Sequence, residues 1–302
     1  MNGTKEVMGM PHALLRCRRA AACGLLGAAV LASIGQARLT AQSKPASPKP
    51  DPMAQARRAY NEQKYDDAIA AASEARKAAT SAASASVVLA RAHLERYRVT
   101  ANAADLVGAR DALKTVDAAV LSPRDQVELS IALGESLYLD EETAFDDRYS
   151  AAAEQFDVAL GRADLLDVAS RDLLFDWWAL ALDRQAQLGT EAGRKSTYRR
   201  IAQRAERELA ENLAATSAAY WLAAASNGMD ELPRAWGAAV AGWVRAGTLG
   251  ARGAALREDL DRLVVQMILP ERAKQIVADG GDARPVLASL KEQWQRLKEL
   301  WR

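Results

Sequence analysis

The chain has 302 residues, of which 40 are basic, 39 are acidic and 50% are hydrophobic, with alanine prominent among the hydrophobic ones. Alanine favours helices and gives little area to a sheet core, and the sequence has no runs of alternating β-branched and aromatic residues. Composition therefore predicts an all-α protein with one substantial core or two small ones. The balanced charge offers no basic excess to neutralise phosphates, which argues against nucleic-acid binding.

Residues 1–42 have the pattern of an export signal. Basic residues precede an uncharged apolar stretch, residues 20–34, and small residues follow it. We expect a secretory signal peptide that is cleaved near Ala37 or Ala41. The alternative is a retained membrane anchor, but a helix of this length spans about 22 Å, less than the roughly 30 Å of the hydrocarbon layer.

Removal of the signal would change the chemistry available to the mature chain. It would take away both cysteines and one of the two histidines, and it would leave 35 basic and 38 acidic residues. Disulfides are then impossible. Residues 43–52 hold four of the nine prolines and predict either a polyproline II linker or a disordered stub.

Residues 53–284 carry an internal repeat of predicted helix pairs. In the first unit, residues 53–77, the small residues Ala56 and Ala68 lie twelve apart, and Ala75 follows after seven more. Short side chains let two antiparallel helices cross at close range. The pattern resembles the tetratricopeptide (TPR) family, in which small residues occupy the same three positions of the repeat. The resemblance implies a right-handed solenoid of antiparallel helix pairs, a TPR-like α-α superhelix, in which each pair needs a neighbour to bury its faces.

The repeat is irregular along the chain. The twelve-residue spacing returns between Ala223 and Ala235, but eighteen positions separate Gly134 from Ala152. Residues 172–210 keep the pattern of a helix pair without the family motif. Extra residues of this kind amount to nearly two helical turns or to a longer loop, so the sequence does not predict the curvature of the stack.

Residues 285–302 are predicted to form a C-terminal capping helix that opens at Pro285. Apolar residues recur there at steps of three and four: Val286, Leu290, Trp294, Leu297 and Trp301. A helix that combines tryptophan with lysine is also typical of a membrane interface, which is the alternative interpretation. A cap is preferred because the last pair of a stack has an outer face to cover.

The sequence carries no catalytic or metal-binding signature. His93 is the only histidine outside the signal segment, so paired metal ligands cannot be assembled, and any catalytic triad would depend on this residue. Acidic residues gather in one segment without the spacing of an EF-hand, which favours a solvated loop over a Ca²⁺ site: Asp140, Glu141, Glu142, Asp146 and Asp147. We therefore expect neither an enzyme nor a cofactor. An all-α glycan hydrolase that uses a lone carboxylate is the alternative.

The TPR resemblance implies a scaffold that binds a protein or peptide partner. In that family the partner lies on a concave face formed mainly by four positions of each first helix. Carried over by motif, this face comprises Arg57, Tyr60, Asn61, Arg91, Leu94, Glu135, Tyr138, Tyr220 and Asn227. Mixed charge with tyrosines suits peptide capture, so we expect a peptide- or protein-binding scaffold in the periplasm or outside the cell.

Tryptophans are concentrated in the second half of the chain. Trp221, Trp236 and Trp243 stand among alanines, and the last two share a helix face because they lie seven apart. The first interpretation is that they fill the core beside small neighbours. The other interpretation is an aromatic pocket for an apolar ligand, in a small-molecule binder resembling the TPR-like proteins associated with tripartite solute transporters.

Overall fold

The computed structural model describes residues 51–140 and 147–301. Within these residues all regular structure is helical, which confirms the predicted all-α class. The expected signal peptide at 1–42 and most of the expected linker at 43–52 lie outside the described residues. Glu141, Glu142 and Asp146 of the acidic segment lie outside them as well.

The described residues form a succession of helices. The helices are α1 (Pro52–Asn61), α2 (Tyr65–Ala75), α3 (Ala82–Thr100), α4 (Ala103–Lys114), α5 (Pro123–Leu139), α6 (Arg148–Leu160), α7 (Val168–Leu188), α8 (Glu191–Glu211), α9 (Thr216–Gly228), α10 (Leu232–Ala246), α11 (Gly250–Leu263), α12 (Leu269–Ala278) and α13 (Ala283–Leu300). Short 3-10 helices, η2 (Ala118–Val120) and η3 (Ala163–Leu165), follow α4 and α6. A π-helical turn, η4 (Val264–Ile268), joins α11 to α12.

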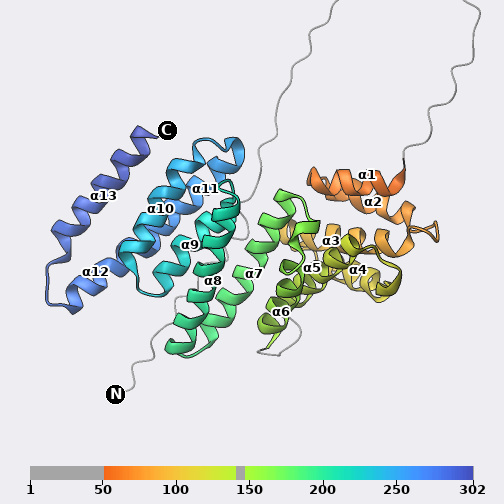
Figure 1. Cartoon of the computed structure of the whole chain (residues 1–302), viewed down its shortest axis with the longest axis horizontal. Helices are drawn as coiled ribbons and strands as arrows, with labels where there is room; N and C mark the ends of the chain where they lie inside the picture. The colour runs from red at the N-terminus through yellow and green to blue at the C-terminus, as the bar shows by residue number, and fades with distance from the viewer. Residues whose placement is uncertain (1–50, 141–146, 302) are drawn as a thin grey trace, which may run out of the picture.

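The helices are arranged in chain order, from α1 at one end of the molecule to α13 at the other (Figure 1). Each helix packs against the next one along the chain, with η4 lying between α11 and α12. Each odd-numbered helix from α1 to α9 also contacts the next odd-numbered helix. The helices α1, α3, α5, α7, α9 and α11 therefore form one continuous row.

Side-chain caps explain where several of the helices begin. The side chains of Asp51, Ser122, Asp167 and Thr190 accept hydrogen bonds from backbone N–H groups in the first turns of α1, α5, α7 and α8. These bonds satisfy donors that have no partner within the helix. Proline occupies the first turn of α1 and of α5, where its missing N–H costs nothing.

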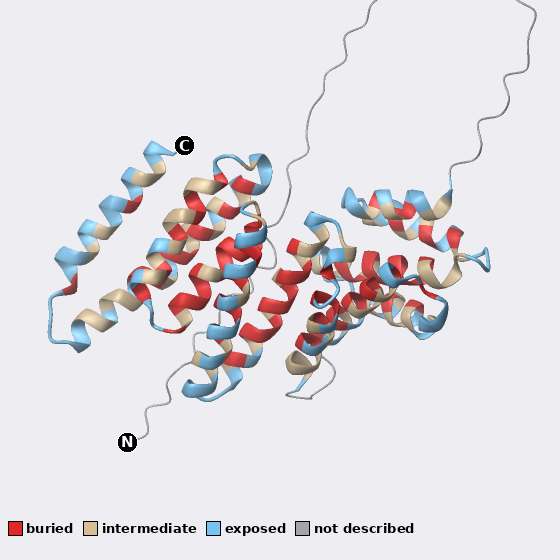
Figure 2. Ribbon diagram, in the orientation of Figure 1, coloured by how far each residue is buried: buried red, intermediate tan, exposed pale blue. Residues whose placement is uncertain are grey.

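Small residues allow the close helix crossings. Ala56 and Ala68, the pair that the first repeat unit singles out, are both 0% exposed. At Gly134 the helices α5 and α6 approach so closely that a Cβ atom would lie 2.5 Å from the ring of Phe156 on α6. A single hydrophobic cluster runs from Ala56 in α1 to Trp294 in α13, and Figure 2 shows buried residues along the whole array.

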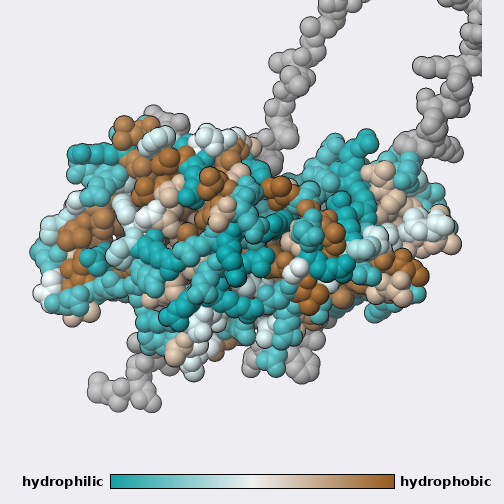
Figure 3. Space-filling view, viewed as in Figure 1, coloured by the Kyte–Doolittle hydropathy of each residue, from teal (hydrophilic) through white to brown (hydrophobic). Residues whose placement is uncertain are grey.

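The C-terminal helix α13 begins at Ala283, two residues before the expected opening at Pro285, with Asp282 as its N-cap. Of its predicted apolar stripe, Trp294 is 1% exposed, whereas Trp301 is 48% exposed. The face of the molecule in Figure 3 is largely hydrophilic, with separate hydrophobic patches. In the described part of the chain, no helix has the length and apolar character needed to cross a membrane.

Candidate binding cleft

A cleft of about 650 Å³ lies between the C-terminal end of α1 and the first turns of α11. The start of α7, the start of α9, Arg91 of α3, and Gln63 and Tyr65 at the turn into α2 also line it. Helices from opposite ends of the chain therefore line one space. The cleft brings together four of the nine residues that motif matching predicts for a binding face: Tyr60, Asn61, Arg91 and Tyr220.

The other five predicted residues do not line this cleft. Arg57 forms ion pairs with Asp125 and Glu128 on α5. The remaining four lie in the interior, with the following exposed fractions: Leu94 0%, Glu135 0%, Tyr138 6% and Asn227 9%. They are buried because helices of the same row cover one another, as α3 and α5 do.

Arg91 is the unusual member of the cleft. The residue is 4% exposed, and its guanidinium lies over the ring of Tyr60, 4.7 Å from the ring centre. Its Nε atom has no hydrogen-bond partner in the described part of the chain, and the side chain forms no ion pair there. Burial acts to lower the pKa of Arg91, but the acidic groups around it, Tyr60, Glu135, Glu128 and Glu95, together outweigh burial, and the pKa lies above its ordinary value. The side chain is therefore a buried cation.

A second buried group, Glu135, lies near Arg91. Neither carboxyl oxygen of Glu135 has a hydrogen-bond partner among the described residues. Burial raises the pKa of Glu135 to about 8, the charge of Glu95 also raises it, and the positive charges of Arg91 and Arg98 act in the opposite direction. Burial therefore favours the protonated form of this carboxyl group, and Glu135 forms no ion pair with Arg91 in the described residues.

The carboxylates of Glu95 and Glu128 already have other partners. Glu95 forms an ion pair of 2.8 Å with Arg98. Glu128 lies 3.3 Å from Arg57 and 3.1 Å from Arg124. These contacts leave Arg91 without a dedicated counter-ion in the described structure.

The opposite wall of the cleft is organised by Asp172 of α7. Its carboxylate accepts hydrogen bonds from the Thr216 hydroxyl at 2.7 Å and from the Ser217 N–H at 3.1 Å, and it pairs with Arg252 at 2.9 Å. These contacts tie the starts of α7 and α9 to α11. The sequence motif gives no hint of this wall, because α7 lies in the unit without the motif and Arg252 lies beyond the best-matched repeats.

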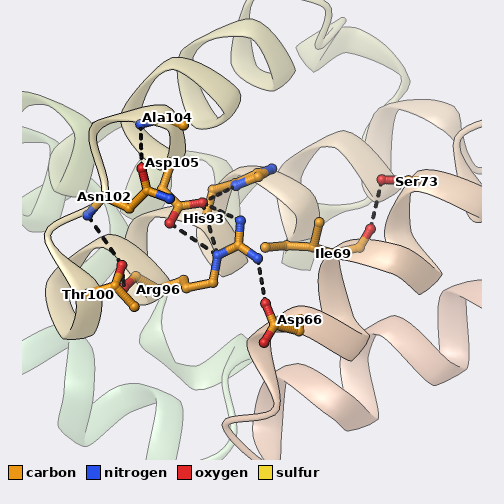
Figure 4. A network of polar contacts seen from close by, with 9 residues as sticks. All are labelled: Asp66, Ile69, Ser73, His93, Arg96, Thr100, Asn102, Ala104 and Asp105. Atoms are coloured by element: carbon orange, nitrogen blue, oxygen red, sulfur yellow. Dashed lines mark hydrogen bonds and ion pairs between the residues drawn. The ribbon is translucent and has the colours of Figure 1, made fainter.

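His93 does not belong to the cleft. Its Nδ1 atom lies 2.8 Å from a carboxylate oxygen of Asp105, which also accepts hydrogen bonds from Arg96 at 2.5 and 3.0 Å. Arg96 reaches Asp66 of α2 at 2.5 Å as well, so the network in Figure 4 joins α2, α3 and α4. A charged network between neighbouring helices is a structural arrangement, and it favours a packing role for His93 over a catalytic one.

The three tryptophans that suggest an aromatic pocket are packed against other groups. Trp221 is 3% exposed, and its indole N–H donates to Asp176 at 3.0 Å. Trp236 and Trp243 both meet Trp294 of α13, with ring centres 5.8 and 5.2 Å apart. None of them lines the cleft. This packing favours the interpretation that they fill the core.

Comparisons with known proteins do not add to this geometry. A scan against protein-family models, a search of the curated proteins and a search of the solved structures each found no match. Within the described residues, no group of three or more histidine, cysteine, aspartate or glutamate side chains is placed to hold a metal ion.

Proposed function

We propose that the protein is a non-enzymatic, TPR-like scaffold of the cell envelope that binds a peptide segment of a partner protein in this cleft. Export rests on the signal-like pattern at 1–42. The solenoid rests on the order of helix contacts, in which each helix meets the next one and each odd-numbered helix meets the next odd-numbered helix. Such nearest-neighbour stacking is the arrangement by which helical repeats build extended binding surfaces.

The observation that carries the proposal is the composition of the cleft. Tyr60 and Tyr220 line the cleft with aromatic rings, and Asn61, an exposed residue at the end of α1, offers an amide. Exposed alanines of α11, Ala251 and Ala254, leave room for an extended chain on the opposite wall. Rigid aromatic groups with nearby hydrogen-bonding groups are typical of surfaces that bind peptides.

Filling the cleft tests the proposal. Residues 43–302 would be used to select binders from a displayed library of random peptides, and the affinities would be measured by calorimetry. We expect Ala254→Trp to weaken the selected peptides by about tenfold or more, because the indole occupies their space. Ala70→Trp, at an exposed position of α2 outside the cleft, is the matched control and should bind normally.

Both variants should keep the far-ultraviolet circular dichroism of the wild type, because both positions are exposed. Peptide binding that is unaffected by Ala254→Trp would show that the cleft is not the peptide site. The volume of the cleft also falls within the range of small-molecule sites, roughly 300–1,000 Å³. The small-molecule alternative would be favoured if no peptide binders are selected and native mass spectrometry finds a small molecule bound to the wild type but not to Ala254→Trp.

A further inference from the structure

We infer that Arg91 is the recognition group for a carboxylate of the bound peptide, an inference that rests on the proposed function of the cleft. The first step is the state of Arg91 itself. A buried charge is costly unless a partner neutralises it. Arg91 is 4% exposed, lines the cleft, and has no ion-pair partner in the described structure. A ligand in the cleft can supply such a partner, because Arg91 lines its wall.

The second step is that none of the nearby carboxyl groups forms an ion pair with Arg91 in the described structure. Glu95 is paired with Arg98. Glu128 is shared by Arg57 and Arg124. Glu135 makes no hydrogen bond in the described part of the chain, either with Arg91 or with any other group.

The third step is the direction from which a ligand can approach the guanidinium group of Arg91. The ring of Tyr60 covers one face of the guanidinium, with 4.7 Å between the ring centre and the central carbon of Arg91. A ligand must therefore approach an edge of the group, where its N–H donors point outward. A planar carboxylate matches two parallel donors of guanidinium, which makes this pair short and directional.

The other wall selects against highly charged anions. Asp167, Glu258 and Asp259 also line the cleft, and their negative charge would repel a polyanion such as a nucleic acid. A peptide that carries one carboxylate toward Arg91 and a neutral or basic group toward α11 fits this division of charge.

The test uses only those selected peptides whose binding is weakened by Ala254→Trp. If no such peptide exists, the proposed function fails before Arg91 is tested. Each Asp, Glu and C-terminal acid of these peptides is replaced in turn by its amide. We expect one replacement to weaken binding to the wild type by about tenfold or more. Acid and amide forms should bind Arg91→Gln almost equally.

Arg200→Gln is the matched control. Arg200 also lies over an aromatic ring, that of Trp178, but it is paired with Asp157 and lies outside the cleft. This variant should distinguish the acid from the amide as the wild type does. Arg91→Lys keeps the positive charge but loses the two parallel N–H donors of the guanidinium. Its preference for the acid over the amide should be intermediate.

A measurement on the wild type does not depend on the stability of the variants. The NMR signals of the Arg91 Nη–H groups should shift when the acid peptide binds, and should shift far less with the amide peptide at equal occupancy. The inference is overturned if no single carboxylate matters to cleft-dependent peptides. It is equally overturned if the preference for the acid persists in Arg91→Gln or the Nη–H signals do not respond.

Discussion

The buried carboxyl group of Glu135 makes the free energy of unfolding depend on pH. The side chain is 0% exposed, and neither oxygen has a hydrogen-bond partner among the described residues. Burial raises its pKa from 4.5 to about 8, Glu95 raises it as well, and Arg91 and Arg98 lower it. The hydroxyl of Tyr60 is a further neighbour of this group, since Glu135 raises the pKa of Tyr60.

The sign follows from proton binding. Between the two pKa values of Glu135 the folded state holds a proton that the unfolded chain has released, so the free energy of unfolding falls as the pH rises. The loss levels off above the folded pKa. Between pH 6.5 and pH 9 it amounts to about 2 kcal/mol. Asp183, whose pKa burial raises to about 6, contributes mostly below this window.

We expect Glu135→Gln to remove this loss, because an amide of similar shape has no proton to release. The assay is urea unfolding followed by circular dichroism at pH 6.5 and pH 9. Glu154→Gln, at an exposed position of α6, is the control and should lose stability as the wild type does. If Glu135→Gln loses as much stability between the two pH values as the wild type, the buried-acid reasoning is wrong.

Three further outcomes are expected from unfolding measurements. Gly253→Ala should destabilise by about 2 kcal/mol or more, because its Cβ would lie 1.8 Å from a backbone oxygen at the end of α10; Gly237→Ala, with open space, should stabilise by about 0.5–1 kcal/mol. Trp294→Ala should cost about 3–5 kcal/mol and change tryptophan fluorescence. Asp105→Asn should cost about 2 kcal/mol at pH 7 and less in acid, because Arg96 and His93 outweigh burial and lower the pKa of Asp105.

The helical class was predictable because its signals are local. Alanine content, caps and small residues at fixed spacing act within one helix or between two neighbours, so the spacing of Ala56 and Ala68 is enough to place them at a close crossing. Gly134 could be assigned in the same way, although its repeat spacing is irregular. Patterns of this kind report on adjacent elements and do not depend on how the array bends.

The candidate site was only partly predictable. Motif positions put Tyr60, Asn61, Arg91 and Tyr220 on one face, and these residues line the cleft. Equivalent positions such as Tyr138 are buried, because periodicity identifies a helix face but not the helix that covers it. The wall around Asp172 depends on contacts between α7, α9 and α11 that no short-range pattern encodes.

The cleft has one wall in α1 and another in α11, and these two helices are linked by a succession of contacts between neighbouring helices. In such an array, a rotation of a degree or two at each junction adds up over the intervening helices. The width of the cleft therefore depends on the sum of small rotations at all the junctions between α1 and α11. Substitutions at any junction between these helices should change the affinity for a ligand, even where the substituted residue does not contact the ligand.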